Sequence, residues 1–193
     1  MITELEPAAV APVDLDAFAA HLRVASGFAG APDEAALIER CARAAGAGIE
    51  GLVGKRLIRR RFKWTVSRWR DPARVAIPLA PVAQVNAVTV IDAEGVWQSV
   101  DSDRWVLIPD GFRPVLAGRG GRLLPGIPAD GVAEVEVVAG YGDAPEDIPE
   151  ELRQAVMLLG AQYYEQRHAA AEGLDELPFG VRDLVARHRE LRL

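Results

Sequence analysis

Cysteine, aromatic side chains and long hydrophobic runs are all scarce in this chain of 193 residues. Its single cysteine, Cys41, excludes a disulfide within the chain, and no apolar run approaches the roughly 20 residues that a membrane-spanning helix needs. The first seven residues carry two glutamates where a secretory signal carries basic residues, so we expect no signal peptide. These absences predict a protein of cytoplasmic origin without disulfides or membrane spans.

Motifs that indicate catalysis or cofactor binding are also lacking. The three histidines (His21, His168 and His188) are far apart, and none has a second histidine or a cysteine at metal-ligand spacing. The glycine-rich segment 118–121 lacks the Gly-Lys-Ser/Thr ending of a phosphate-binding loop and lies between predicted strands, so we interpret it as a turn. We therefore expect no catalytic residue, no cofactor and no metal. A small hydrolase would need titratable groups clustered in a pocket, and no spacing indicates one.

Two other features could indicate chemistry, and both have a simpler structural interpretation. Five carboxylates lie close together in sequence: Asp143, Glu146, Asp147, Glu150 and Glu151. They could hold a metal or form an acid–base pair, but we favour a loop leading into a helix, whose positive N-terminal end stabilises acids. Cys41 lies on the apolar stripe of a predicted helix, which favours a buried and unreactive thiol.

Charge is distributed unevenly along the chain. The net charge is −6, yet the segment 55–70 (the basic band) has eight basic residues and no acid, which leaves 14 basic against 28 acidic residues elsewhere. Such a band can bind nucleic acid, an acidic partner or another copy of the chain, or it can protect an exposed strand edge. Trp64 and Trp69 could stack on bases, but tryptophans in a strand usually pack into a core. We therefore favour a charged wall or subunit contact. The band consists of Lys55, Arg56, Arg59, Arg60, Arg61, Lys63, Arg68 and Arg70.

Hydrophobic periodicity changes twice along the chain. Apolar residues recur at helical spacing in 14–23 and 32–53, at alternate positions within 58–140, and at helical spacing again in 149–171 and 181–191. The sequence therefore predicts an α+β fold in one domain, in which the N-terminal and C-terminal helices form a small bundle and a β-rich insert lies between them. The candidate strands, separated by turn residues, are 62–69, 75–79, 85–91, 96–100, 105–108, 113–116 and 133–138.

Several local details follow from the same patterns. Gly54 is expected to end the helix 32–53, and the run of small residues 44–48 would let another segment approach that helix closely. In the first strand, alternation predicts Phe62, Trp64, Val66 and Arg68 on one face and Lys63, Thr65, Ser67 and Trp69 on the other.

The last predicted helix, 181–191, presents an apolar stripe formed by Val181, Leu184, Val185, His188 and Leu191. About eleven residues make a marginal helix in water, so another surface must cover this stripe. That surface is either the chain's own domain or a groove in another chain.

Five segments, occurring in the same order, carry a family resemblance. The most specific, 135–168, runs from a strand ending in Ala-Gly-Tyr-Gly-Asp through Ile-Pro into a helix ending in Tyr-Tyr-Glu-x-Arg, and 77–95 contains Leu-x-Pro-Val before a strand. The others are 14–24 (DLDAFAAHLRV), 33–57 (DEAALIERCARAAGAGIEGLVGKRL) and 177–189 (LPFGVRDLVARHR). The combination covers more than half of the chain. It resembles the phage head–tail connector family, also called head–tail adaptors, which includes the adaptor of gene transfer agents.

This resemblance implies a structural, non-enzymatic protein at the head–tail interface of a phage or gene transfer agent particle. Copies would form a ring, usually of twelve, beneath the portal protein, extend the DNA channel and join it to a stopper or tail-completion protein. DNA would pass through the channel without sequence-specific binding, and the particle would assemble in the bacterial cytoplasm. The basic band would then serve subunit or channel contacts. The alternative is a nucleic-acid-binding packaging accessory that uses the band, and steep salt dependence would identify it.

In this family the C-terminal segment inserts into the portal. Carried over residue by residue, the resemblance implies portal contacts by Val181, Arg182, Leu184, Val185, Arg187, His188, Arg189 and Leu191, with Arg192 as a further charged flank.

Overall fold

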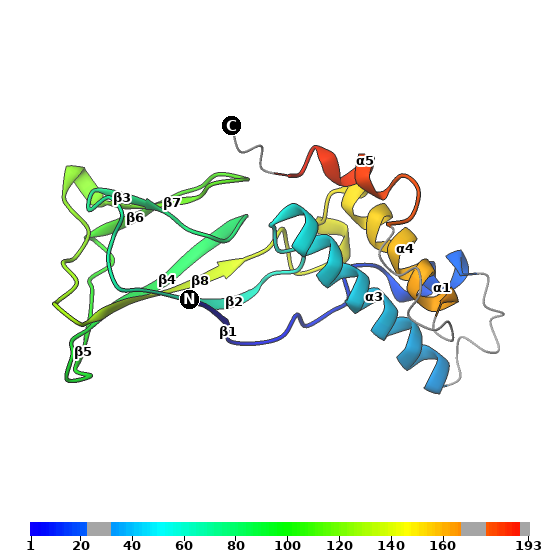
Figure 1. The fold of residues 1–193 in the computed structure, drawn as a ribbon, viewed down its shortest axis with the longest axis horizontal. Helices are drawn as coiled ribbons and strands as arrows, with labels where there is room; N and C mark the ends of the chain where they lie inside the picture. The colour runs from blue at the N-terminus through cyan, green and yellow to red at the C-terminus, as the bar shows by residue number, and fades with distance from the viewer. Residues whose placement is uncertain (23–31, 167–176, 190–193) are drawn as a thin grey trace. The chain divides into compact units, whose positions relative to one another are not determined.

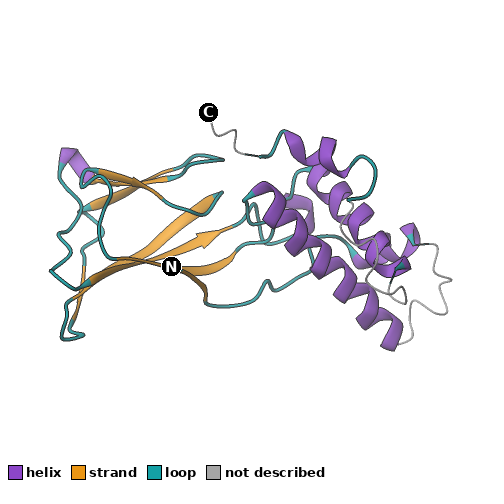
Figure 2. Ribbon diagram, viewed as in Figure 1, coloured by secondary structure: helices purple, strands orange, loops and turns teal. Residues whose placement is uncertain are grey.

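The computed structural model describes residues 1–22, 32–166 and 177–189, and these form two compact units. A β unit contains Met1–Ala8 and Arg59–Tyr141, and a helical unit contains Ala9–Ile58 and Gly142–Leu193 (Figure 1). The α-helices belong to the helical unit and the strands to the β unit, which also contains a short 3₁₀ helix at Arg119–Gly121 (Figure 2). The predicted α+β fold is therefore confirmed. That the whole chain acts as one domain stays a prediction.

The helical unit contains α1 (Leu15–His21), α3 (Pro32–Val53), α4 (Glu150–Glu165) and α5 (Val181–Ala186). The helix predicted at 181–191 is shorter than expected, because the N–H groups of His188 and Arg189 bond to carbonyls three residues back, as in a 3₁₀ turn. The predicted end at residue 171 of the helix 149–171 lies outside the described residues. The Asp14 side chain caps α1 by accepting a hydrogen bond of 2.7 Å from the backbone N–H of Ala17. Gly54 follows the end of α3 with a φ of +70°, and its N–H donates to the carbonyl of Glu50 at 2.9 Å. This left-handed position favours glycine, so the predicted end of the helix is confirmed.

Small residues let the helices of this unit pack closely. A Cβ added at Gly160 on α4 would lie 2.7 Å from Cζ of Phe18, a fully buried residue of α1. A Cβ added at Gly46 on α3 would lie 2.6 Å from Cγ of Pro12. The expected close approach to the run 44–48 is therefore confirmed, because no larger side chain fits there without displacing its neighbour.

The β unit consists of two antiparallel sheets. The larger has the order β1-β2-β8-β4-β5 and the smaller the order β3-β7-β6. In chain order the strands are β1 (Ile2–Glu4), β2 (Arg60–Val66), β3 (Arg74–Ala76), β4 (Val82–Ile91), β5 (Trp97–Ser99), β6 (Trp105–Ile108), β7 (Val115–Gly118) and β8 (Val132–Ala139). Side chains of both sheets share one core, which includes Phe62, Trp64, Val88, Leu116 and Val137.

The alternation of β8 shows how the sequence builds the larger sheet. Ala133, Val135 and Val137 are fully buried, while Glu134, Glu136 and Val138 lie on the half-exposed face. A strand with one buried face needs this period of two, because successive side chains point to opposite faces. β8 pairs with β2 on one side and β4 on the other, so it is the central strand.

Most of the predicted strands have different limits: β4, for example, begins at Val82 where the sequence predicted residue 85. The first ends at Val66, so Trp69 is not on the opposite face: it packs against the core, its ring 6.2 Å from Trp64, and donates to the carbonyl of Pro125. The second covers Arg74–Ala76 only, because Pro78 has no N–H to offer a ladder. The strand predicted at 113–116 begins at Val115, since the Asp110 carboxylate accepts the N–H groups of Phe112 and Arg113 in a turn.

The sequence pattern also missed β1. This strand has three residues, all exposed, so it carries no alternation of apolar and polar side chains. It exists because Ile2–Glu4 pairs with Phe62, Lys63 and Trp64 of β2. The β unit is therefore an insert completed by the N-terminal segment.

Candidate assembly surfaces

Much of the basic band is neutralised within the chain. Arg61 donates two hydrogen bonds to Oε1 of Glu136, at 3.0 Å and 2.6 Å, and Lys63 Nζ lies 3.0 Å from Oε1 of Glu134. Both acids lie on β8, beside β2, so the charges form a ladder on the half-exposed face of the sheet. The hydrogen bond from Arg61 holds the pKa of the Glu136 carboxyl below its usual range.

Arg60 belongs to a different environment in the same strand. Its Nε lies 3.1 Å from Oε1 of Glu4 on β1, and its guanidinium carbon lies 5.1 Å from the centre of the Phe62 ring. The Arg60 side chain is only 10% exposed. Since β2 lies between β1 and β8, the idea that the band protects an exposed strand edge is wrong.

The start of the band connects α3 to the rest of the chain. Lys55 is 4% exposed, and Arg56 Nη1 lies 3.4 Å from Oε2 of Glu50. The other oxygen of Glu50, itself buried, accepts the backbone N–H of Leu57 at 2.8 Å. These residues hold the segment that follows α3 in place, so Lys55 and Glu50 have a structural role. Arg59 is half-buried and also interacts within the chain.

Two residues of the band, Arg68 and Arg70, are exposed and belong to a larger cluster that the sequence analysis missed. Backbone hydrogen bonds join their segment to two others: Leu124 donates to Pro72 at 2.7 Å, Gly118 to Ala73 at 3.0 Å, and Arg119 to Arg104 at 3.0 Å. Six exposed arginines therefore lie on neighbouring segments of the β unit. We call them the arginine cluster: Arg68, Arg70, Arg74, Arg104, Arg119 and Arg122.

The apolar stripe of α5 is covered by the chain's own helical unit. Val181 is fully buried and Val185 is 2% exposed, and α5 packs against α4 and α3. For Val181 and Val185, the alternative that another chain covers the stripe is therefore wrong. Leu184 and His188 are half-buried, and the exposed positions are Arg182, Arg187 and Arg189. Leu191 and Arg192 lie outside the described residues, as does His168.

His188 lies at the contact between α5 and the other helices. Its Nε2 is 3.7 Å from Oε2 of Glu151 on α4. Burial, together with the positive charges of Lys55 and Arg187, lowers the pKa of His188 despite the opposing effect of Glu151. The neutral form of the His188 imidazole is therefore favoured while α5 is docked.

We expect the docking of α5 to weaken as the pH falls. Because the pKa of His188 is lowered in the folded chain, the unfolded state binds more protons, and the stabilisation present above about pH 6.5 is lost below it. Hydrogen exchange of the α5 amides, corrected for intrinsic rates, should show faster opening at pH 5 than at pH 8. His188→Gln should remove this difference and His21→Gln should preserve it. Equal opening at both pH values in the unchanged chain would contradict the assignment.

The acidic residues around position 147 form no metal site in the described ranges. The five carboxylates near residue 147 occupy a short 3₁₀ turn, Pro145–Asp147, and the start of α4, and no group of three potential metal ligands is found among the described residues. Cys41 is buried, as predicted.

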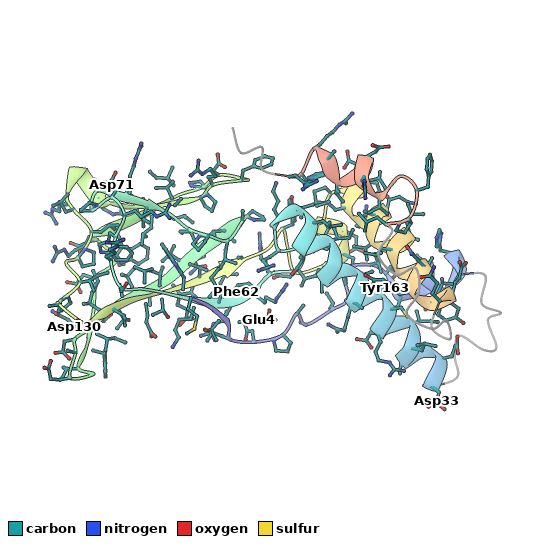
Figure 3. All side chains as sticks on the ribbon, viewed as in Figure 1. Glu4, Asp33, Phe62, Asp71, Asp130 and Tyr163 are labelled. Atoms are coloured by element: carbon teal, nitrogen blue, oxygen red, sulfur yellow. The ribbon has the colours of Figure 1, made fainter. Side chains whose placement is uncertain are left out.

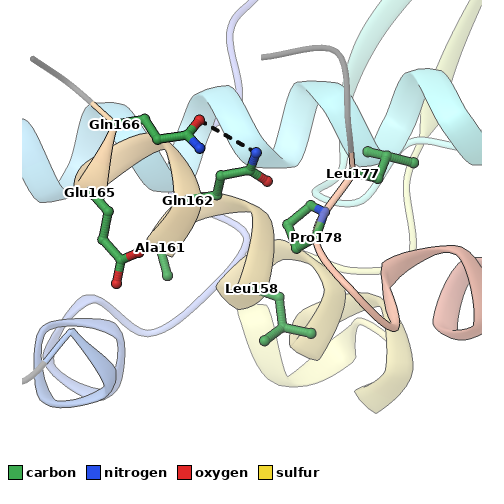
Figure 4. A pocket seen from close by; sticks show the side chains of 7 residues that line it. All are labelled: Leu158, Ala161, Gln162, Glu165, Gln166, Leu177 and Pro178. Atoms are coloured by element: carbon green, nitrogen blue, oxygen red, sulfur yellow. Dashed lines mark hydrogen bonds between the residues drawn. The ribbon is translucent and has the colours of Figure 1, made fainter. Parts of the chain in front are cut away.

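A shallow hollow at the end of α4 is lined by Leu158, Gln162 and Pro178 among others, and Glu165 is its one titratable residue (Figure 4). Within the ranges that the structure describes, no helix has the length and apolar character needed to cross a membrane.

Comparison with known proteins gives matches only among solved structures: no family model and no curated protein matches the chain. A structure described as "Neck of empty GTA particle computed with C6 symmetry" contains a chain 40% identical, with a TM-score of 0.86 over 100% of this chain and 97% of that one. A chain in "Virion of native gene transfer agent (GTA) particle" is 40% identical with a TM-score of 0.84. A chain in "Neck of native GTA particle computed with C12 symmetry" is 38% identical with a TM-score of 0.82, and the coverage is the same for both.

Identity and fold agree over the whole chain, and both units are included in the match. The class is therefore that of structural components of a virion neck. The chain belongs to the family of neck proteins of gene transfer agent particles.

Proposed function

We propose that the chain is the head–tail adaptor of a gene transfer agent or phage particle. Copies form a ring beneath the portal, extend the DNA channel and join it to a stopper or tail-completion protein, without enzymatic activity. The observation that carries the proposal is the full-length likeness to neck structures with a TM-score of 0.86. The C6 and C12 symmetries of the matching structures support a ring, since a head-to-tail contact between copies closes into one when the rotation fits.

The contact with the portal is assigned to the exposed side of α5 and the segment after it. Arg182, Arg187 and Arg189 extend from this side, while Val181 and Val185 pack inside the chain. These two valines therefore support the portal contact by holding α5 in place, and Leu184 and His188 lie at the border between the two environments. Of the basic band, Arg68 and Arg70 are the exposed members available for subunit or channel contacts, because Arg61, although exposed, is paired with Glu136.

The experiment is negative-stain imaging of the protein mixed with portal rings from the same gene cluster. Three proteins are compared: the full chain, a truncation that ends at Leu177, and the full chain with Arg182, Arg187 and Arg189 changed to serine. We expect an additional ring below the portal only with the unchanged chain.

The serine variant is the more informative of the two changed proteins. Truncation exposes the apolar surface of α3 and α4 that α5 covers, so loss of binding could follow from misfolding. The three arginines are exposed, and replacing them leaves the buried face of α5 unchanged. If this variant still forms a ring on the portal, the three arginines are not part of the contact. No ring with the unchanged chain would refute the adaptor assignment.

A further inference from the structure

We propose that the arginine cluster binds the phosphate backbone of double-stranded DNA without regard to sequence. This inference rests on the proposed function, which brings DNA past the protein. The cluster combines two residues of the basic band with four arginines from later in the chain. It lies in the β unit near Asp71, which Figure 3 labels beside β3.

The cluster is held in a fixed arrangement by the smaller sheet. β3 pairs with β7, which places Arg74 opposite Ala117, and β7 pairs with β6, whose first residue follows Arg104. The turn after β7 then carries Arg119 and Arg122, with a positive φ at Gly120 and Gly121 between them. Three separate segments of the chain thus bring positive charge to one region, and backbone hydrogen bonds join them.

Unlike the ladder on β2 and β8, the cluster is not neutralised by the chain. In the part of the chain that the structure describes, no ion pair includes any of the six arginines. Asp71, Asp101 and Asp103 lie in the same segments, which leaves more arginines than acids there. Like charges held close together repel each other, so a ligand of opposite charge would stabilise this surface.

The surrounding side chains favour DNA over an acidic protein. Protein interfaces usually centre on a cluster of buried aromatic and aliphatic side chains. Among the described residues of 68–74, 101–105 and 118–124, Leu123 is the only exposed large apolar side chain. The exposed Val96 and Trp97 belong to β5 and the turn before it. Duplex DNA presents a phosphate about every 1.7 Å along its axis and needs no apolar contact.

The test is the binding of a fluorescent 30-base-pair duplex to the full chain, followed by anisotropy at several salt concentrations. Two variants that each lose two positive charges are compared: Arg119→Gln/Arg122→Gln in the cluster, and Arg61→Gln/Lys63→Gln in the ladder. We expect the cluster variant to bind about tenfold or more weakly at low salt, and the slope of log affinity against log salt to decrease by about one for each arginine removed. The ladder variant should bind within about twofold of the unchanged chain.

Ring formation, scored by native mass measurement, separates this inference from the proposed function. A chain that forms rings but does not bind the duplex at low salt overturns the inference and leaves the neck role standing. Equal weakening by both variants also overturns it, because binding would then follow net charge. If the cluster variant loses ring formation while DNA affinity is unchanged, the cluster binds an acidic protein surface instead. If the unchanged chain binds DNA but never forms rings, and the cluster variant loses DNA binding, the inference is supported and the proposed ring is not.

Discussion

Replacing Val185 with aspartate should release α5 from the helical unit. Val185 is 2% exposed in the contact with α4 and α3, and an unpaired carboxylate cannot be accommodated in an apolar contact without a large cost. We expect the docked state to lose about 3 kcal/mol, which corresponds to about a hundredfold larger population of released helix. The effect should be local, because α5 is the terminal helix of this unit.

Hydrogen exchange resolved to single amides measures this release. The amides of α5 should lose protection in Val185→Asp, while those of β8 should keep theirs. Ala186→Asp is the matched control, because the neighbouring position is exposed and the same charge remains in water there. Normal protection of α5 in Val185→Asp would show that the docking seen in the structure does not stabilise the helix.

Replacing Gly118 with alanine should destabilise the β unit. A Cβ at this position would lie 1.9 Å from the carbonyl oxygen of Arg122, so the backbone of the turn must move. Such overpacking costs about 3 kcal/mol, and for a unit of this size it should lower the melting temperature by roughly 15 °C. Differential scanning calorimetry of the full chain measures the change.

Gly126→Ala provides the control for this prediction. No atom lies within 4 Å of a Cβ built at Gly126, and its φ is not positive, so alanine fits without strain. The stability of this variant should be unchanged or slightly higher, because alanine restricts the unfolded chain more than glycine does. If both variants melted at the temperature of the unchanged chain, the close contact between Gly118 and Arg122 would be wrong.

The sequence was most informative where a pattern is local. The helix 32–53 was predicted with its ends because Pro32, Gly54 and the apolar stripe between them all act within a few residues. β8 was predicted because its alternation is complete and one of its faces is buried. β1 could not be predicted, since three exposed residues form a strand only through pairing with β2.

The charged surfaces show the limit of reading a sequence in order. The eight basic residues of 55–70 are a single feature in sequence, but tertiary structure divides them. Lys55 and Arg60 are enclosed, Arg61 and Lys63 pair with acids more than 70 residues away, and Arg68 and Arg70 stay exposed. The arginine cluster has no local signal, because its members are spread from residue 68 to residue 122. Pairing of β3, β7 and β6 brings them together.

By itself, the sequence determined the class of fold and both ends of the helix 32–53, and it carried the resemblance to head–tail connectors; all of these depend on periodicity and on short ordered motifs. Only the tertiary structure decided which charges are neutralised, which apolar residues of α5 are covered, and which arginines gather on one surface. The physical reason is that burial and ion pairing depend on distances between residues far apart in the chain, and strand order and helix packing set those distances.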